Sequence, residues 1–195
     1  ERVVRASWDL LDPRDQSLLS IVCAFHGPVT VEDVQDVAGP EAWHGLERLR
    51  MSSMIHTRDM PDALVLQPFD EVRRFVQGQG STTLEMQVMI AQSVVRRARP
   101  VAAGVFTSRH MDHVHAFHRR MRDLYGAWDL ALQGQPIGVF EHFAVFRRLV
   151  MLTSQERSGT RLEASLAMVS SEPQRAQVVA SAAFARRRLG QKRQA

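Results

Sequence analysis

The sequence predicts a mainly α-helical protein in two parts, the first of which also contains a β-hairpin. Apolar residues recur at spacings of three and four along most of the 195 residues, which is typical of amphipathic helices. Two short apolar runs between residues 54 and 66 flank a stretch containing Asp and Pro, which favours a turn. Gly78-Gln79-Gly80-Ser81 marks the boundary, so we expect one domain over residues 1–78 and a helical segment over residues 79–195.

Three helices are expected before the hairpin. Asp12 and Pro13 begin the first, because an Asp side chain accepts hydrogen bonds from the free amides of a helix start and proline needs no donor there. Thr30 and Asp33 begin the second in a similar way. The first helix should end before Gly27-Pro28, the second at Gly39, and the third should run from Pro40 to Met51 with Trp43, Leu46 and Leu49 on its apolar side.

A hairpin and a closing helix complete the first part. The expected strands are residues 54–57 and 63–66, joined by a turn over residues 58–62. Residues 70–77 predict a helix with Val72, Phe75 and Val76 inward. Three helices followed by a β-hairpin is the order of a winged helix, a variant of the helix-turn-helix.

Only helices are expected after residue 80. Thr82 to Glu85 predicts a capping box for a helix over residues 84–99, ended by Pro100. Breaks are expected at residues 134–136, 158–159 and 170–173, which leaves helices over residues 113–132, 139–153, 161–170 and 173–189. These lengths suit antiparallel helix pairs, as in helical repeats, although no block in this segment clearly matches another.

The composition is typical of a soluble globular protein, with 45% apolar and 24% charged residues. Apolar runs such as residues 101–106 are far shorter than the roughly 20 residues that span a bilayer, so no membrane contact is expected. Cys23 is the single cysteine, which excludes an intramolecular disulfide and favours a core position. We therefore expect a cytoplasmic location.

The two parts carry opposite charge. Residues 1–80 hold 8 Arg against 13 Asp and Glu, a net charge of −5, whereas residues 81–195 have a net charge of +9. With 24 Arg, one Lys and no Asn, the composition suggests a GC-rich genome rather than selection for phosphate binding. The basic clusters of the second part admit two interpretations: ordinary solvated helix faces, or a basic surface for an acidic protein or nucleic acid.

Several motifs of the first part occur in an order that belongs to a known family. Residues 7–11 read SWDLL, residues 12–19 read DPRDQSLL, residues 25–32 read FHGPVTVE and residues 69–75 read FDEVRRF. Residues 5–77 thus resemble the winged-helix segment of bacterial STAND ATPases, the NB-ARC-like signal-transduction ATPases. Their corresponding motifs are SWxLL, D-P-x-x-Q/R-x-L-L, an aromatic-Gly-Gly turn with T-x-E-x-A, and L-E-T-V-R-E-Y. Residues 175–191 look like the first helix of a TPR-like repeat, which often follows in this family.

The resemblance implies a modular regulator, often of transcription, whose P-loop ATPase domain precedes this segment. Because the chain begins at Glu1 without Met, we expect it to be a piece of such a protein. The winged helix would hold the upstream nucleotide-binding domain in its ADP-bound state, and the helical segment would relay a partner or inducer signal. We expect Trp8, Arg48, Asp70 and Arg73 to be the domain-docking residues. The family's Met-His-Asp triplet corresponds to Pro68-Phe69-Asp70, which argues against direct phosphate sensing.

Motifs for catalysis are absent from the chain. It contains no G-x-x-x-x-G-K-[ST], G-x-S-x-G, H-E-x-x-H or C-x-x-C, so we expect no enzyme and no cofactor here, with ATP or ADP belonging to the parent protein. Residues 110–118 hold four His and one Asp, but no two His have the i, i+4 spacing that suits chelation from one helix face. A solvated helix is therefore favoured over a metal site, and proton sensing near pH 6 is a further possibility.

The main alternative is an autonomous winged-helix DNA-binding transcriptional regulator with a helical effector or dimerisation domain. Its recognition helix would be residues 40–51. The outward side chains of that helix are mixed in charge within an acidic domain, whereas DNA binding depends on neutralising phosphates. We therefore expect this surface to contact protein. The outward set is Glu41, His44, Glu47, Arg48 and Arg50. Trp8, Trp43 and Trp128 are expected in the core, although Trp8 also suits contact with the upstream domain.

Overall fold

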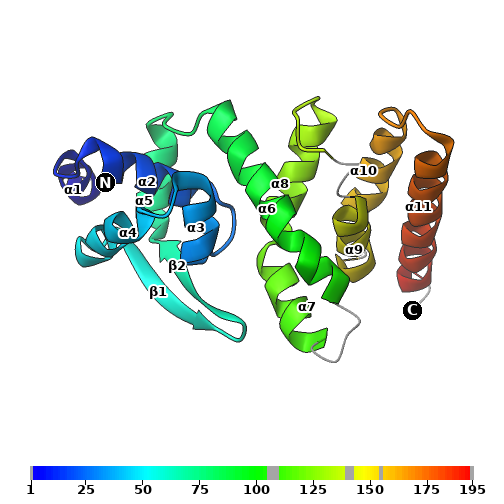
Figure 1. Cartoon of the computed structure of the whole chain (residues 1–195), viewed down its shortest axis with the longest axis horizontal. Helices are drawn as coiled ribbons and strands as arrows, with labels where there is room; N and C mark the ends of the chain where they lie inside the picture. The colour runs from blue at the N-terminus through cyan, green and yellow to red at the C-terminus, as the bar shows by residue number, and fades with distance from the viewer. Residues whose placement is uncertain (1, 105–109, 139–142, 154–155, 194–195) are drawn as a thin grey trace.

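The chain forms eleven helices and one two-stranded antiparallel sheet within the residues that the structure describes (Figure 1). The structure is a computed structural model that describes residues 2–104, 110–138, 143–153 and 156–193. The elements are α1 (Arg2–Asp9), α2 (Pro13–Ala24), α3 (Val31–Ala38), α4 (Ala42–Met51), β1 (Ile55–Met60), β2 (Ala63–Pro68), α5 (Asp70–Gly78), α6 (Leu84–Gly104), α7 (His110–Arg119), α8 (Met121–Leu132), α9 (Phe143–Thr153), α10 (Glu156–Leu166) and α11 (Glu172–Arg193). The mainly α-helical class is confirmed. Elements α1–α5 and the hairpin lie at one end of an elongated molecule, and α7–α11 follow beyond the long helix α6.

The helix starts predicted at Asp12 and at Thr30 are confirmed. Asp12 Oδ1 accepts a hydrogen bond from the Asp15 amide at 2.8 Å and caps α2. At α3, the Thr30 hydroxyl accepts from the Asp33 amide, and the Asp33 carboxylate accepts from the Thr30 amide. Gly39 ends α3 with a φ of 90°, a conformation that side chains with a Cβ disfavour. Helix α1 was not predicted.

The core of the first part forms around α2, where Leu19, Val22 and Cys23 are fully buried. Burial raises the pKa of Cys23 to about 12, so its thiol remains protonated. Gly45 lets α4 approach closely, because a Cβ there would lie 2.5 Å from Leu18 Cδ2. Helix α5 closes this core with the three side chains that periodicity predicted: Val72, Phe75 and Val76.

The hairpin differs from the prediction in its turn. Met60 pairs with Ala63, so only Pro61 and Asp62 form the turn, whereas five turn residues were expected. Arg58 and Asp59, which were expected in the turn, instead pair with Val65 and Leu64 on β2 and lengthen the ladder. Val29 adds a bridge to β2, with its amide and carbonyl both bonded to Leu66.

The helical segment also differs from the prediction at several points; α10, for example, spans Glu156–Leu166 where residues 161–170 were expected. Helix α6 continues through Pro100 to Gly104. Pro100 has no backbone N–H and so removes one hydrogen bond of the helix, but this loss is local. The flanking Ala98 and Ala102 remain buried and keep the helix packed on both sides of it. Its start is capped by Thr83, whose hydroxyl accepts from the Met86 amide, and not by the Thr82–Glu85 box. The predicted break at residues 158–159 lies within α10.

A single helix was expected over residues 113–132, but α7 ends at Arg119 and α8 begins at Met121. The Arg120 amide bonds to the Phe117 carbonyl in a tight turn. Apolar spacing continues across this turn, which explains why the break was missed. The break positions the buried Arg119 and Arg120 side by side toward the first part of the chain.

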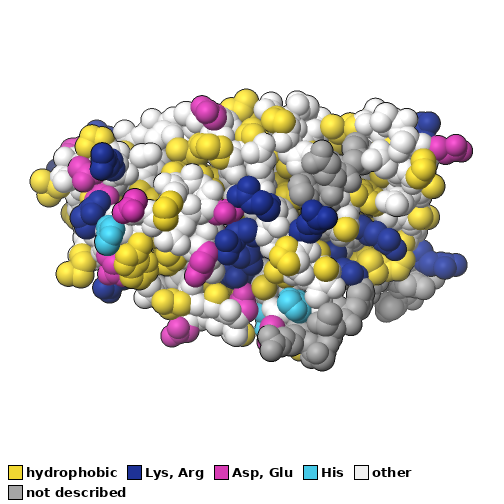
Figure 2. Space-filling model, viewed as in Figure 1, with side chains coloured by type: hydrophobic (Ala, Val, Ile, Leu, Met, Phe, Trp, Pro, Cys, Tyr) yellow, Lys and Arg dark blue, Asp and Glu magenta, His cyan; other side chains and the backbone are white. Residues whose placement is uncertain are grey.

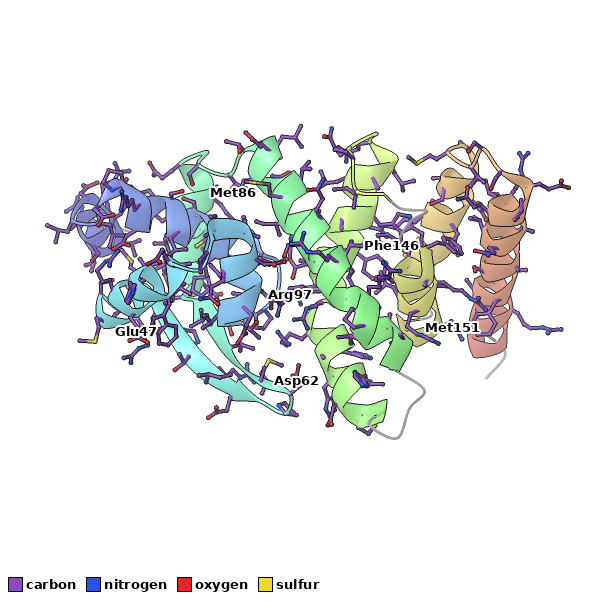
Figure 3. All side chains as sticks on the ribbon, viewed as in Figure 1. Glu47, Asp62, Met86, Arg97, Phe146 and Met151 are labelled. Carbon is purple, nitrogen blue, oxygen red and sulfur yellow. The ribbon has the colours of Figure 1, made fainter. Side chains whose placement is uncertain are left out.

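Trp128 lies at the centre of the helical core and is fully buried. Its ring packs against Phe146 of α9, which is labelled in Figure 3, with centroids 5.1 Å apart. Its Nε1 donates to Ser165 Oγ at 3.0 Å. These contacts join α8, α9 and α10. The core prediction holds for Trp128, whereas Trp8 is half-buried.

Trp43 departs from the core prediction, since it is 46% exposed. The small residues Ala42 and Gly45 occupy the buried face of α4 beside Leu46 and Leu49. Trp43 therefore lies at the edge of that face. Across the described ranges, no helix is long and apolar enough to cross a membrane.

Candidate functional site

The two parts of the chain meet where α3 and the hairpin turn face α6, α7 and α8. Carboxylates from the first part contact arginines from the helical segment, and we call this cluster the ionic junction. Asp62 at the hairpin tip faces α7, and Arg97 lies on α6 beside α3 (Figure 3). The space-filling view shows basic side chains gathered beside acidic ones in the middle of the molecule (Figure 2). The ionic junction consists of Asp33, Asp36, Asp62, Arg96, Arg97, Arg119 and Arg120.

Asp33 is the centre of the ionic junction. Its Oδ1 accepts from Arg120 Nη2 at 2.9 Å, and its Oδ2 accepts from Arg119 Nη1 at 3.3 Å. Arg97 Nε lies 3.0 Å from Oδ1 as an ion pair without hydrogen-bond geometry. Burial acts to raise the pKa of Asp33, but Arg120, the Thr30 amide and Arg119 outweigh it and hold the pKa below its usual value. Asp33 is therefore an ionised, buried carboxylate.

Arg119 extends the ionic junction to the hairpin turn. Its side chain is only 3% exposed, and its Nε and Nη2 both donate to Asp62 Oδ2, at 3.1 and 2.9 Å. Because the same guanidinium also reaches Asp33, one side chain of α7 ties α3 to the turn. A planar guanidinium with five donors is suited to such bridging.

Two further contacts, each with one exposed partner, flank the buried centre of the ionic junction. Asp36 Oδ2 accepts from Ser93 Oγ and from Arg96 Nη2, both at 2.6 Å. On the other side, the His26 amide donates to Asp123 Oδ1 at 2.6 Å, and His26 Nδ1 lies 3.4 Å from the same oxygen. The hydrogen bond to Asp123 raises the pKa of His26 despite the opposing effect of partial burial.

Glycine permits the close approach of the two backbones beside His26. A Cβ on Gly27 would lie 2.9 Å from the Arg119 carbonyl oxygen and 3.2 Å from Asp123 Oδ2. The loop after α2 therefore fits directly against the turn between α7 and α8. A larger residue at position 27 would separate these backbones.

Two of the four predicted docking residues form contacts within the first part. Arg48 binds Asp15 through two hydrogen bonds of 2.7 and 2.6 Å, and this contact raises the pKa of Arg48. Arg73 donates to the carbonyls of Cys23 and Phe25, which satisfies the C-terminal end of α2. Both arginines thus link helices of the first part.

The other two predicted residues lie at its surface. Trp8 is half-buried and packs edge-on against Phe75, with ring centroids 6.0 Å apart. Asp70 is exposed at the first turn of α5. Arg73 also lies on α5, whereas Arg48 lies on α4.

Sequence reasoning missed the ionic junction. Asp33 was identified only as a helix cap, and Arg119 and Arg120 belong to the basic clusters, for which solvated helix faces were one of two open interpretations. For these two arginines that interpretation is wrong, because both are buried against Asp33. The opposite net charges of the two parts were the one signal that pointed to this contact.

The histidines of residues 110–118 lie in different surroundings. His113 packs on α6, where a Cβ on Gly104 would lie 2.4 Å from its Nε2. His115 and His118 line a pocket beside the hairpin turn. No group of three His, Cys, Asp or Glu residues within the described part of the chain is arranged to hold a metal ion. The side chain of His110 lies outside the described residues.

Comparisons of the chain with protein-family models, curated proteins and solved structures gave no match.

Proposed function

We propose that the chain is the regulatory and protein-interaction segment of a STAND-type ATPase regulator. A winged helix over residues 1–78 docks on a nucleotide-binding domain that lies outside this chain, and a TPR-like helical segment over residues 79–195 relays the signal of a partner or inducer protein. ATP or ADP is bound by the parent protein in the cytoplasm, and this chain contributes no catalytic residue or cofactor. The ordered motifs of residues 5–77 support this proposal.

The outward face of α4 supports protein contact rather than DNA reading. Trp43 and Met51 expose apolar surface there, at 46% and 76%. Arg50 pairs with Glu47 on the same helix at 3.0 Å, and Arg48 is held by Asp15. A helix that reads DNA draws its affinity from cations that neutralise phosphates, and here the cations are already neutralised.

The ionic junction is the observation that carries the proposal. It holds the hairpin turn against α7 through Asp62 and Arg119, so the wing tip is occupied within the chain. It also gives the helical segment a direct connection to α3, since α6, α7 and the α7–α8 turn all reach Asp33. A partner that moves α7 and α8 would therefore alter the position of the winged helix, which is the kind of coupling a relay requires.

Fluorescence anisotropy with mixed duplex DNA tests the proposal against the DNA-binding alternative. We expect no binding at about 50 mM salt or at about 200 mM salt. This range is chosen because phosphate contacts weaken steeply across it, so binding through them would show a clear salt dependence. Tight binding with a steep salt dependence would overturn the proposal and favour the autonomous transcriptional regulator.

Two matched variants locate any DNA contact. Glu47→Gln and Glu163→Gln each remove one carboxylate paired with an arginine, the first on α4 and the second on α10. If α4 reads DNA, Glu47→Gln strengthens binding more than Glu163→Gln does. We expect neither substitution to produce binding.

A further inference from the structure

A groove of about 440 Å³ lies between α9 and α11, in the part of the helical segment away from the winged-helix end (Figure 1). Arg147 is exposed at this groove, and Arg148 beside it is half-buried. Phe143 and Met151 add apolar surface from α9, and Gln177 adds a side-chain amide from α11. The groove therefore combines positive charge with apolar walls.

The positive charge of this groove is not balanced within the described part of the chain. No described residue that lines the groove is acidic, and Arg147 takes part in no ion pair there. Asp129 and Glu163 on the neighbouring helices are already paired with Arg161 and Arg186. Figure 2 shows basic side chains gathered over the helical segment, where acidic ones are few. The counter-charge for the groove therefore has to come from another molecule.

Arg148 is held close to a second cation. Its Nε donates to the Ala102 carbonyl at 3.1 Å, and its Nη1 lies 3.8 Å from Met151 Sδ. Burial and the neighbouring Arg147 lower the pKa of Arg148, because both disfavour a charged guanidinium. A carboxylate between the two arginines would relieve this repulsion, and the fork of a guanidinium matches the geometry of a carboxylate.

We propose that the groove binds an acidic, extended peptide segment of a partner protein. One carboxylate of the peptide lies between Arg147 and Arg148, the next apolar side chain packs on Met151, and Gln177 supplies a donor and an acceptor for the peptide backbone. Nucleic acid is disfavoured because its bases stack on exposed aromatic rings, and Phe143 is only 7% exposed. This inference rests on the function proposed above in one respect, that the helical segment receives a partner protein.

Two synthetic peptides test the charge of the ligand. The first alternates Glu with Leu, and the second has Gln in place of every Glu. In fluorescence anisotropy with the full chain, we expect the Glu peptide to bind about tenfold more tightly, because hydrogen bonds between charged groups are the stronger ones. In NMR of methyl-labelled methionines, the same peptide should shift Met151. Equal affinities, no binding at millimolar peptide, or an unshifted Met151 would each overturn the proposal.

Variants at Ala144 locate the site. Ala144 lines the groove and is exposed, so a longer side chain there leaves the core in place. Ala144→Glu puts a carboxylate four residues before Arg148, which neutralises the groove from within, and Ala144→Gln adds nearly the same bulk without charge. We expect Ala144→Glu to weaken binding of the Glu peptide about tenfold and Ala144→Gln to leave it nearly unchanged. Equal effects of the two variants would contradict the assignment.

A second pair of variants separates this groove from general charge attraction. Arg147→Gln and Arg122→Gln each remove one exposed cation, but Arg122 lies on α8 and does not line the groove. We expect only Arg147→Gln to weaken the Glu peptide, by about fivefold. An equal loss in both variants would show non-specific attraction and overturn the site.

A single-stranded thymidine oligonucleotide tests the rival ligand. Binding of this oligonucleotide that Ala144→Glu abolishes would reassign the groove to nucleic acid and overturn the proposal, whereas we expect none. The function proposed above is tested separately with duplex DNA. Failure of the peptide experiments without duplex binding would therefore reject this groove and leave that function standing.

Discussion

The interior of the first part and its junction with the helical segment are stabilised by different interactions. Around α2 the buried side chains are apolar, with Leu19 and Val22 fully removed from solvent. At the ionic junction the buried side chains are charged, with Asp33 between Arg119 and Arg120. Apolar burial is non-directional, whereas a buried charge is tolerated only beside its partner. We infer that the apolar core, which runs through both parts, stabilises the fold and that the charges select which faces of the two parts meet.

The largest effect is expected from breaking the centre of the ionic junction. Asp33→Ala leaves Arg119 and Arg120 buried without their carboxylate, which should lower the free energy of unfolding by about 3–5 kcal/mol in urea denaturation. Asp33 also caps α3, so Thr30→Ala is the comparison: it removes a cap hydrogen bond, costs about 1 kcal/mol and leaves the arginines paired. Equal losses in the two variants would show that Asp33 acts only as a cap.

The apolar interior should respond differently from the ionic junction to salt. Leu19→Ala deletes a fully buried side chain and should lower the free energy of unfolding by about 2–5 kcal/mol. Because no charge is involved, we expect the same loss at about 50 and 500 mM NaCl. A loss that changes strongly with salt would mean that Leu19 also supports the charged contacts.

A smaller effect is expected at the exposed edge of the ionic junction. The Arg96 side chain is 62% exposed, so Arg96→Gln should cost less than about 1 kcal/mol, and this cost should fall as salt is added. Arg99→Gln removes the same charge from an exposed position on the same helix and is the control. If the two variants lose equal stability at low salt, the pair with Asp36 contributes nothing.

The smallest effect concerns His26. Its pKa is raised above 6.5 by Asp123, so its contribution to stability is complete below pH 6.5 and is lost as the pH rises through the folded-state value. The contribution is small, because the side chain is 66% exposed. An NMR titration of the ring should give a pKa above 6.5, and Asp123→Asn should lower it. The stability difference between the natural chain and His26→Gln should shrink above that pKa; a difference that grows would contradict the ion pair.

Local chemistry predicted the elements of the first part except α1, but the residues that pair between these elements could not be predicted in the same way. Asp12 and Thr30 identify helix starts because a cap involves residues only three positions apart. Arg48 was predicted to be a docking residue, yet its partner Asp15 lies 33 residues earlier in the chain. No local pattern contains such a pair.

The helical segment shows the same limit. Apolar periodicity located its helices but not the turn at Arg120, because the spacing continues through the turn. The ionic junction depends on that turn, and only the opposite charges of residues 1–80 and 81–195 pointed toward it. Charge balance indicates that two parts attract each other but does not identify the residues that meet.

The pairing of Asp33 with Arg119 spans 86 residues, and this has a consequence for biosynthesis. A ribosome adds about 5–20 residues per second, so the α3 carboxylate is made roughly 4–17 seconds before Arg119 and Arg120. During that interval the nascent chain carries a carboxylate that lacks these counter-charges. The speed of translation between residues 33 and 120 therefore sets how long Asp33 stays without these two partners.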